Sequence, residues 1–212
     1  MIRFFNGFVK VTGIIPYWMC FRTKIYYMNK KVQSNRLKGP TVLISNHTSV
    51  FDYAAYLGVF VSRTLRFQMA EVLFKNKFLA WFLRSMGGIY VDRGLYNFSF
   101  VDRSVEILNE GGVVGVFPEA RIPKPGEERP LPFKPSAASV ALRSGAQIVP
   151  VYTDGCYFKW KRARVIIGTP FYAKDFYDES LSEKENLRKI SNEMRNKILE
   201  LKDEFERQTK KA

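Results

Sequence analysis

The chain has a single histidine, His47, and an aspartate, Asp52, follows it five residues later. An imidazole that donates a hydrogen bond to a carboxylate from one ring nitrogen keeps the other nitrogen available as a base. Positions five apart on one regular helix do not share a face. The two side chains therefore meet only if His47 lies on a turn and Asp52 lies in the first turn of a helix. A base held in this way can take the proton from a hydroxyl group of a substrate.

The same residues also allow a purely structural interpretation. Ser49 and Asp52 have the spacing of a capping box, in which both side chains satisfy backbone groups at the start of a helix. His47 would then only occupy the turn before that helix. The spacing by itself leaves both interpretations open.

Two arginines follow other apolar runs and point to phosphate as a ligand. The segment GGIYVDR ends with Arg93, and the segment FPEAR ends with Arg121. An arginine side chain can hold a phosphate through two parallel hydrogen bonds. Each arginine could instead pair with a neighbouring acid, which is Asp92 for the first and Glu119 for the second.

The elements that must position these residues alternate between strands and helices. The predicted strands cover residues 41–45, 64–70, 87–93, 113–119, 146–154 and 162–170. The predicted helices cover residues 51–60, 75–86, 98–112 and 135–145. This alternation predicts an α/β fold with a mostly parallel central sheet flanked by helices. His47 then lies at the carboxyl end of a strand, where such sheets bind their ligands.

The chain divides into an N-terminal segment, residues 1–37, and an α/β domain, residues 38–212. The end of the domain, about residues 181–210, is charged and predicts an amphipathic helix. Its apolar residues recur three or four positions apart: Leu187, Ile190, Met194, Ile198, Leu201 and Phe205. This stripe predicts a helix docked on the domain itself.

The N-terminal segment is apolar but too short to cross a membrane. Only 11 uncharged residues separate Lys10 from Arg22, and Pro16 interrupts them, whereas a spanning helix needs about 20 apolar residues. We predict one or two short helices in the membrane interface. The side chains expected to insert are Phe4, Phe5, Phe8, Ile14, Ile15, Tyr17, Trp18 and Phe21. The residues expected to meet lipid phosphates are Lys10, Arg22, Lys24, Lys30 and Lys31. The alternative is a helix packed on the core of the domain.

Composition limits the partners. The formal net charge is +14, so the surface attracts anions such as nucleic acid, anionic lipid or phosphorylated substrates. Aromatic residues make up 15% of the chain, and rings beside basic residues suit a membrane interface. No nucleic-acid motif is present, so a nucleic-acid partner is not expected. The two cysteines, Cys20 and Cys156, give neither a disulfide framework nor a zinc-binding spacing.

Taken in order, these motifs resemble the glycerolipid acyltransferase family, in particular its 1-acyl-sn-glycerol-3-phosphate (lysophosphatidic acid) acyltransferases. The family block Asn-His-x4-Asp is matched by Asn46, His47 and Asp52. The later blocks are matched by residues 87–93, residues 117–121, Phe133-Lys134, and the pair Val149-Pro150. Order and spacing agree over roughly residues 38–170. In the third block the family glycine is replaced by Ala120, and Arg121 comes one residue early.

The resemblance implies a peripheral enzyme of phospholipid biosynthesis on the cytoplasmic face of the cell membrane. It would move an acyl group from acyl-CoA or acyl carrier protein (acyl-ACP) to the sn-2 hydroxyl of lysophosphatidate, giving phosphatidate. His47 would be the general base and Asp52 would orient it. The residues implied to bind the acceptor are Arg93, Glu119, Arg121 and Lys134. Neither a metal nor another cofactor is expected. The alternatives are a different lysolipid acceptor, or a non-catalytic module of the same fold that binds lipid surfaces.

Overall fold

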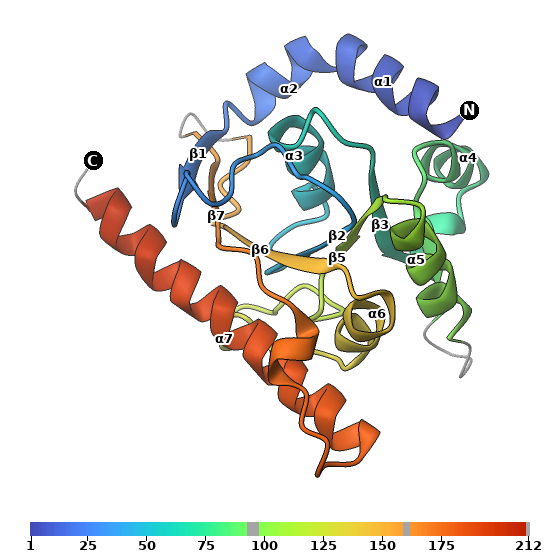
Figure 1. The fold of residues 1–212 in the computed structure, drawn as a ribbon. Helices are drawn as coiled ribbons and strands as arrows, with labels where there is room; N and C mark the ends of the chain where they lie inside the picture. The colour runs from blue at the N-terminus through green and yellow to red at the C-terminus, as the bar shows by residue number, and fades with distance from the viewer. Residues whose placement is uncertain (93–97, 159–161, 211–212) are drawn as a thin grey trace.

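A computed structural model of the chain describes residues 1–92, 98–158 and 162–210. Within these ranges, one seven-stranded sheet has the order β1-β7-β6-β2-β5-β3-β4 (Figure 1). The strands are β1 (Lys24–Tyr27), β2 (Thr41–Ser45), β3 (Leu65–Ala70), β4 (Ile89–Val91), β5 (Val113–Val116), β6 (Gln147–Thr153) and β7 (Arg164–Ile167). Only β6 and β7 pair antiparallel, and every other neighbouring pair is parallel. The predicted mostly parallel sheet is therefore confirmed.

Helices cover both faces of this sheet. They are α1 (Ile2–Thr12), α2 (Ile14–Cys20), α3 (Asp52–Val59), α4 (Lys77–Ser85), α5 (Ser99–Asn109), α6 (Ser136–Ser144) and α7 (Glu183–Lys210). Two short 3-10 helices, η1 (Glu71–Phe74) and η2 (Ala173–Phe176), complete the description. The strands and helices predicted between residues 41 and 170 are all present, most of them shorter at their ends. Strand β1, a four-residue edge strand, was not predicted from the sequence.

The central strand β2 shows why the predicted strands are apolar along their whole length. Leu43 packs with Tyr56 of α3 on one face of the sheet. Val42 and Ile44 point to the other face, where α5, α6 and α7 lie. All three strand residues are fully buried. A strand covered on both faces has no polar side, so its sequence does not alternate between apolar and polar residues.

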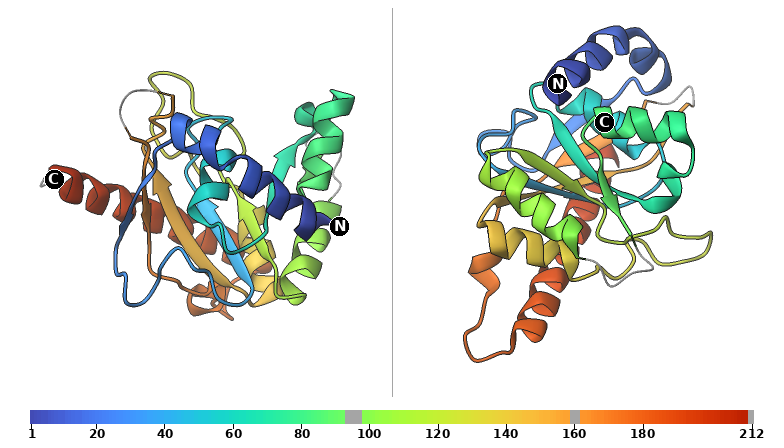
Figure 2. Two further views of the ribbon diagram at one scale, coloured as in Figure 1. Left: turned by 90° about the horizontal axis from the view of Figure 1, so that it is seen from above. Right: turned by 90° about the vertical axis from the view of Figure 1, so that its right-hand side faces the viewer.

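The charged tail forms α7 and docks on the domain, as predicted. Its stripe residues Ile190, Met194, Ile198 and Leu201 are fully buried against the sheet and α6. Seen from above, α1 crosses one side of the sheet while α7 lies on the opposite side (Figure 2). The two amphipathic ends of the chain therefore cover different faces.

The N-terminal segment forms two helices, α1 and α2, with the break at Gly13 and Pro16 inside the first turn of α2. Five of the eight side chains expected to insert into a membrane are exposed: Phe4, Phe8, Ile14, Ile15 and Trp18. No helix among the described residues is long and apolar enough to span a membrane.

Part of the expectation for this segment is wrong. Phe5 packs edge-on against Trp81 of α4, and Phe21 is buried. Tyr17 is partly buried and its hydroxyl donates to the carbonyl of Ala55 in α3. The Lys10 ammonium donates to the carbonyls of Phe60, Val61 and Arg63, at 3.3, 3.2 and 2.6 Å, and so does not face outward. One face of the segment therefore packs on the domain, and only the other face is free.

Candidate active site

His47 lies on the turn after β2, and Asp52 is the first residue of α3. The His47 Nδ1 atom lies 2.8 Å from the Asp52 Oδ2 atom. The Asp52 side chain is completely buried, and the His47 side chain keeps 19% of its surface exposed. The turn and the first helical turn thus bring the two residues together as the spacing predicts. Among the described residues no group bonds to His47 Nε2, which leaves that nitrogen free.

The Asp52 carboxylate accepts four further hydrogen bonds. Its Oδ2 atom accepts the backbone N–H groups of Thr48, at 2.7 Å, and Ser49, at 3.0 Å. Its Oδ1 atom accepts the hydroxyls of Thr48 and Tyr157, both at 2.7 Å. Burying a carboxylate is costly unless its oxygens are hydrogen-bonded. The bond from the Ser49 N–H to Asp52 is half of a capping box. Asp52 therefore both caps the start of α3 and bonds to His47.

Two neighbours fix the position of His47. The preceding Asn46 side chain donates to the carbonyl of Thr153 and accepts the Thr153 N–H, both at 2.9 Å, which joins the end of β2 to β6. The Phe117 ring, which follows β5, stacks on the imidazole with centroids 4.2 Å apart and planes 11° from parallel. The imidazole is therefore held both through its backbone and across its ring face.

Glu119 holds the same turn through the backbone of His47. Its Oε1 atom accepts the His47 backbone N–H at 2.7 Å, and its Oε2 atom accepts the Leu131 N–H at 2.8 Å. The residue is only 3% exposed, and this burial raises the pKa of its carboxyl above the ordinary value of 4.5. Both oxygens are thus bonded to the protein, and a contact with substrate stays a prediction.

The predicted phosphate ligands are less closely gathered. Arg121 is exposed and makes two hydrogen bonds to Glu127, at 2.6 and 2.8 Å. The Arg121 guanidinium lowers the pKa of the Glu127 carboxyl to about 2. Lys134 is exposed, and its ammonium has no hydrogen bond or ion pair among the described residues. Arg93 lies outside the described residues, so its predicted role is untested.

Sequence reasoning missed Tyr157 and Thr48 as partners of Asp52. The Tyr157 hydroxyl comes from a loop 105 positions along the chain, and no motif marks it. Thr48 lies inside the first family block but at one of its variable positions. The only sequence signal for Thr48 is that threonine is a residue type favoured just before a helix begins.

Two apolar side chains close to His47 in the turn are exposed. Val50 is 66% exposed and Phe51 is 44% exposed, although both follow His47 closely in the chain. The ring of Phe51 meets Phe158 edge-on, with centroids 4.5 Å apart. A base with apolar surface beside it suits a substrate that is partly hydrocarbon.

Comparison with known proteins places this geometry in a family. Residues 24–154, more than half of the chain, match the Acyltransferase family. The chain is 28% identical over 147 residues to a 1-acyl-sn-glycerol-3-phosphate acyltransferase of Bacillus subtilis (strain 168), covering 67% of this chain and 71% of that protein. It is 27% identical over 156 residues to the chloroplastic acyltransferase BAT2 of Brassica napus, covering 72% of this chain and 43% of that protein.

The fold matches a solved structure as well. The crystal structure of the 1-acyl-sn-glycerophosphate acyltransferase PlsC from Thermotoga maritima superposes with a TM-score of 0.64 at 22% identity. The match covers 95% of this chain and 79% of that one. The fold, the dyad at the end of β2 and the family match over residues 24–154 agree, and this chain belongs to the Acyltransferase family.

Proposed function

We propose that the protein is a 1-acylglycerol-3-phosphate acyltransferase that uses a fatty acyl thioester as donor. The observation that carries this proposal is the His47–Asp52 pair, with Nδ1 bonded to the carboxylate and Nε2 free. The family match and the name of the Bacillus subtilis relative support the reaction class and the acceptor. Acyl-CoA and acyl-ACP both fit the proposal as donors.

In this proposal His47 moves one proton. Its Nε2 atom takes the proton of the sn-2 hydroxyl while the oxygen attacks the thioester carbonyl carbon. The carbon–sulfur bond then breaks, and the imidazolium returns the proton to the leaving thiolate, giving an ester and a free thiol. The Asp52 carboxylate stabilises the imidazolium between these steps. General-base help of this kind contributes about 10²–10⁴-fold to the rate.

The acceptor phosphate would be bound by Arg93, Arg121 and Lys134. A phosphate can compete with Glu127 for Arg121, because that ion pair is exposed to solvent. Glu119 would act through the backbone of the turn, given its two bonds to backbone amides. No step requires a metal or another cofactor.

The enzyme would act as a peripheral protein on the cytoplasmic face of the membrane. The free face of α1 and α2 exposes large apolar residues, including Phe4 at 81%, Ile15 at 68% and Trp18 at 65%. Helix α4 adds Phe78 at 75% and Trp81 at 56%. A contiguous apolar patch of this kind commonly marks an interaction surface. The net charge of +14 adds attraction to anionic lipid.

The test is acyl transfer by purified protein in detergent micelles that contain lysophosphatidate. Thiol release from acyl-CoA or acyl-ACP and the mass of the product would be measured for the wild type and for His47→Ala. We expect phosphatidate from the wild type and at least a 100-fold loss in the variant. Transfer by His47→Ala at the wild-type rate would refute the mechanism. Vesicle binding without thiol release from any donor would instead identify a non-catalytic lipid-binding module.

A further inference from the structure

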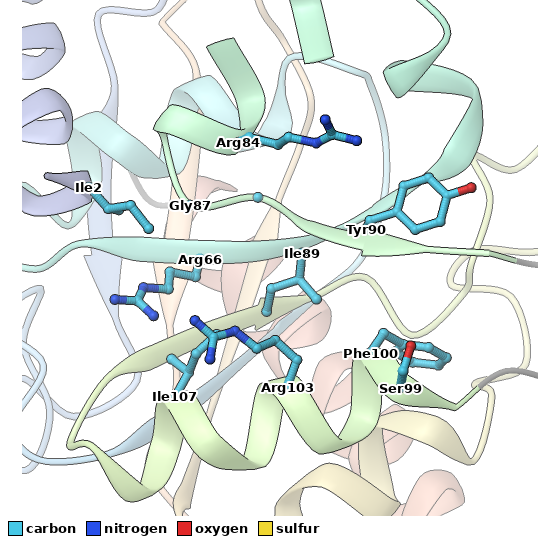
Figure 3. A pocket seen from close by; sticks show the side chains of 11 residues that line it. Ile2, Arg66, Arg84, Gly87, Ile89, Tyr90, Ser99, Phe100, Arg103 and Ile107 are labelled. Carbon is cyan, nitrogen blue, oxygen red and sulfur yellow. The ribbon is translucent and has the colours of Figure 1, made fainter. Parts of the chain in front are cut away.

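A second site is suggested by a cavity of about 400 Å³ at the β4 edge of the sheet (Figure 3). It lies between the start of β3, the Gly87-Gly88 turn, α5 and the first residues of α1. The sheet register sets Arg66 of β3 level with Val42 of β2, through their common partner Val114. His47 is five residues beyond Val42, or roughly 16 Å along the strand direction. The cavity also reaches Tyr90 of β4, which is nearly level with the end of β2, but β5 and β3 lie between those two strands, roughly 14 Å across the sheet. The cavity is therefore separate from the dyad.

Positive charge gathers in this cavity without full compensation. Arg66, Arg84 and Arg103 line it, and the guanidinium groups of Arg66 and Arg103 point toward one another (Figure 3). Burial lowers the pKa of Arg66, and the charges of Arg103 and Arg3 lower it further. Among the described residues neither Arg66 nor Arg3 forms a hydrogen bond or ion pair.

Two acidic groups act on the three arginines that line the cavity, so one positive charge is left over. Glu106 is bonded to Arg103 at 2.7 Å, and the charge of Glu110 raises the pKa of Arg66 by more than either neighbouring arginine lowers it. Glycine at position 87 leaves room for the Arg66 side chain. The φ of Gly87 is +88°, and a Cβ built there would lie 3.1 Å from Cγ of Arg66. Positive charge gathered in a cavity raises the local concentration of anions, and a phosphate can accept hydrogen bonds from two guanidinium groups at once.

The remaining walls of the cavity are hydrocarbon. Ile2, Ile89 and Ile107 contribute to its lining. Ile2 belongs to α1, and the exposed ring of Phe4 lies two positions further along that helix. Arg84 of α4 also lines the cavity, so both helices that carry the exposed apolar side chains Phe4, Phe78 and Trp81 border it. A ligand that fits both parts has an anionic head group and hydrocarbon chains.

We propose that this cavity binds the phosphate group of an anionic phospholipid, with Arg66 and Arg103 holding the phosphate and the acyl chains lying along the surface of α1 and α4. This lipid is distinct from the acceptor at His47. The inference rests on the proposed function only in taking the surface of α1 and α4 as the side that faces the membrane. Its role would be to hold the enzyme on anionic membranes in one orientation.

The test uses the full-length protein and a soluble short-chain lipid, dihexanoyl phosphatidylglycerol, with binding measured by calorimetry. Arg66→Gln/Arg103→Gln removes two charges inside the cavity. The matched control, Lys75→Gln/Lys77→Gln, removes two exposed charges at the start of α4. Since each guanidinium that hydrogen-bonds the phosphate contributes about tenfold or more to affinity, we expect at least about a 100-fold loss for the arginine variant. The lysine variant should stay within about twofold of the wild type. Equal losses for both variants would overturn the proposal, because they would indicate diffuse attraction.

A second arm separates a lipid from a free anion. Glycerol 3-phosphate and inorganic phosphate carry the charge without the chains, so their Arg66- and Arg103-dependent binding should be at least tenfold weaker than that of the lipid. Equal affinities would overturn the assignment to a phospholipid. Acyl transfer in detergent micelles should be unchanged in the arginine variant. That activity would also show that the variant is folded. A failure of His47→Ala to lose activity would refute the proposed function and leave this binding result intact.

Discussion

Replacing Asp52 with asparagine removes the charge of the dyad and keeps a side chain of the same size and shape. The donors to Oδ2 are His47 Nδ1–H and the N–H groups of Thr48 and Ser49. None of these groups can accept a hydrogen bond as long as His47 keeps its proton on Nδ1. The asparagine side chain must therefore place its oxygen, not its NH2 group, where Oδ2 of Asp52 lies. The amide nitrogen then faces the hydroxyls of Thr48 and Tyr157, which can rotate and accept its hydrogens. All five contacts are retained, and we expect the free energy of unfolding to change by less than about 2 kcal/mol.

The effect on the reaction should be much larger. During transfer the His47 imidazolium faces the Asp52 carboxylate, with Nδ1 and Oδ2 2.8 Å apart in the resting structure. Two unit charges about 4 Å apart attract by about 4 kcal/mol at an effective dielectric constant of about 20. Because about 1.4 kcal/mol corresponds to a tenfold change in rate, Asp52→Asn should lower kcat by about 10³-fold.

The assay is thiol release from acyl-CoA in micelles of lysophosphatidate, together with urea unfolding of each variant. Asp102→Asn is the matched control, because it removes a carboxylate from the exposed ion pair with Arg143. We expect that control to keep its kcat. A kcat within threefold of the wild type for Asp52→Asn would show that the charge is not needed for transfer. Loss of the fold in that variant would refute the hydrogen-bond reasoning instead.

Three other variants are tested by urea unfolding: one for a hydrogen bond, one for backbone strain and one for a raised pKa. Tyr157→Phe removes a hydrogen bond to a buried carboxylate and should lower the free energy of unfolding by about 1.5–3 kcal/mol. The control is Tyr152→Phe, because the Tyr152 hydroxyl has no hydrogen bond among the described residues. Equal losses of stability in the two variants would contradict this account. Ala120 has a φ of +60°, so Ala120→Gly should raise that free energy by about 0.5–1 kcal/mol, and a decrease would argue against strain. Because burial raises the pKa of Glu119, the native state binds more protons than the unfolded state above pH 4.5. The wild type should therefore lose stability relative to Glu119→Gln as the pH rises from 4.5 toward neutral, whereas parallel pH curves for the two proteins would exclude this effect.

Much of the fold follows from local patterns. Apolar runs of strand length that alternate with helical segments indicate a parallel sheet, because each strand must be covered on both faces. The stripe of α7 predicts its docking for a similar reason, since an apolar face on a charged helix has to be buried. The meeting of His47 with Asp52 is local too, because five residues and one turn set the distance between them.

Contacts between distant segments required the tertiary structure. Tyr157 reaches Asp52 only because the loop after β6 passes over the start of α3, and no spacing in the chain encodes that approach. Lys10 resembles a residue that meets lipid phosphates, but three carbonyls beyond α3 accept its hydrogens instead. The arginines at the β4 edge are likewise scattered along the chain. The sequence by itself determined which residues can do chemistry and which runs form the sheet, whereas packing of the helices decided which side chains share a site, because that depends on distances across the fold and not along the chain.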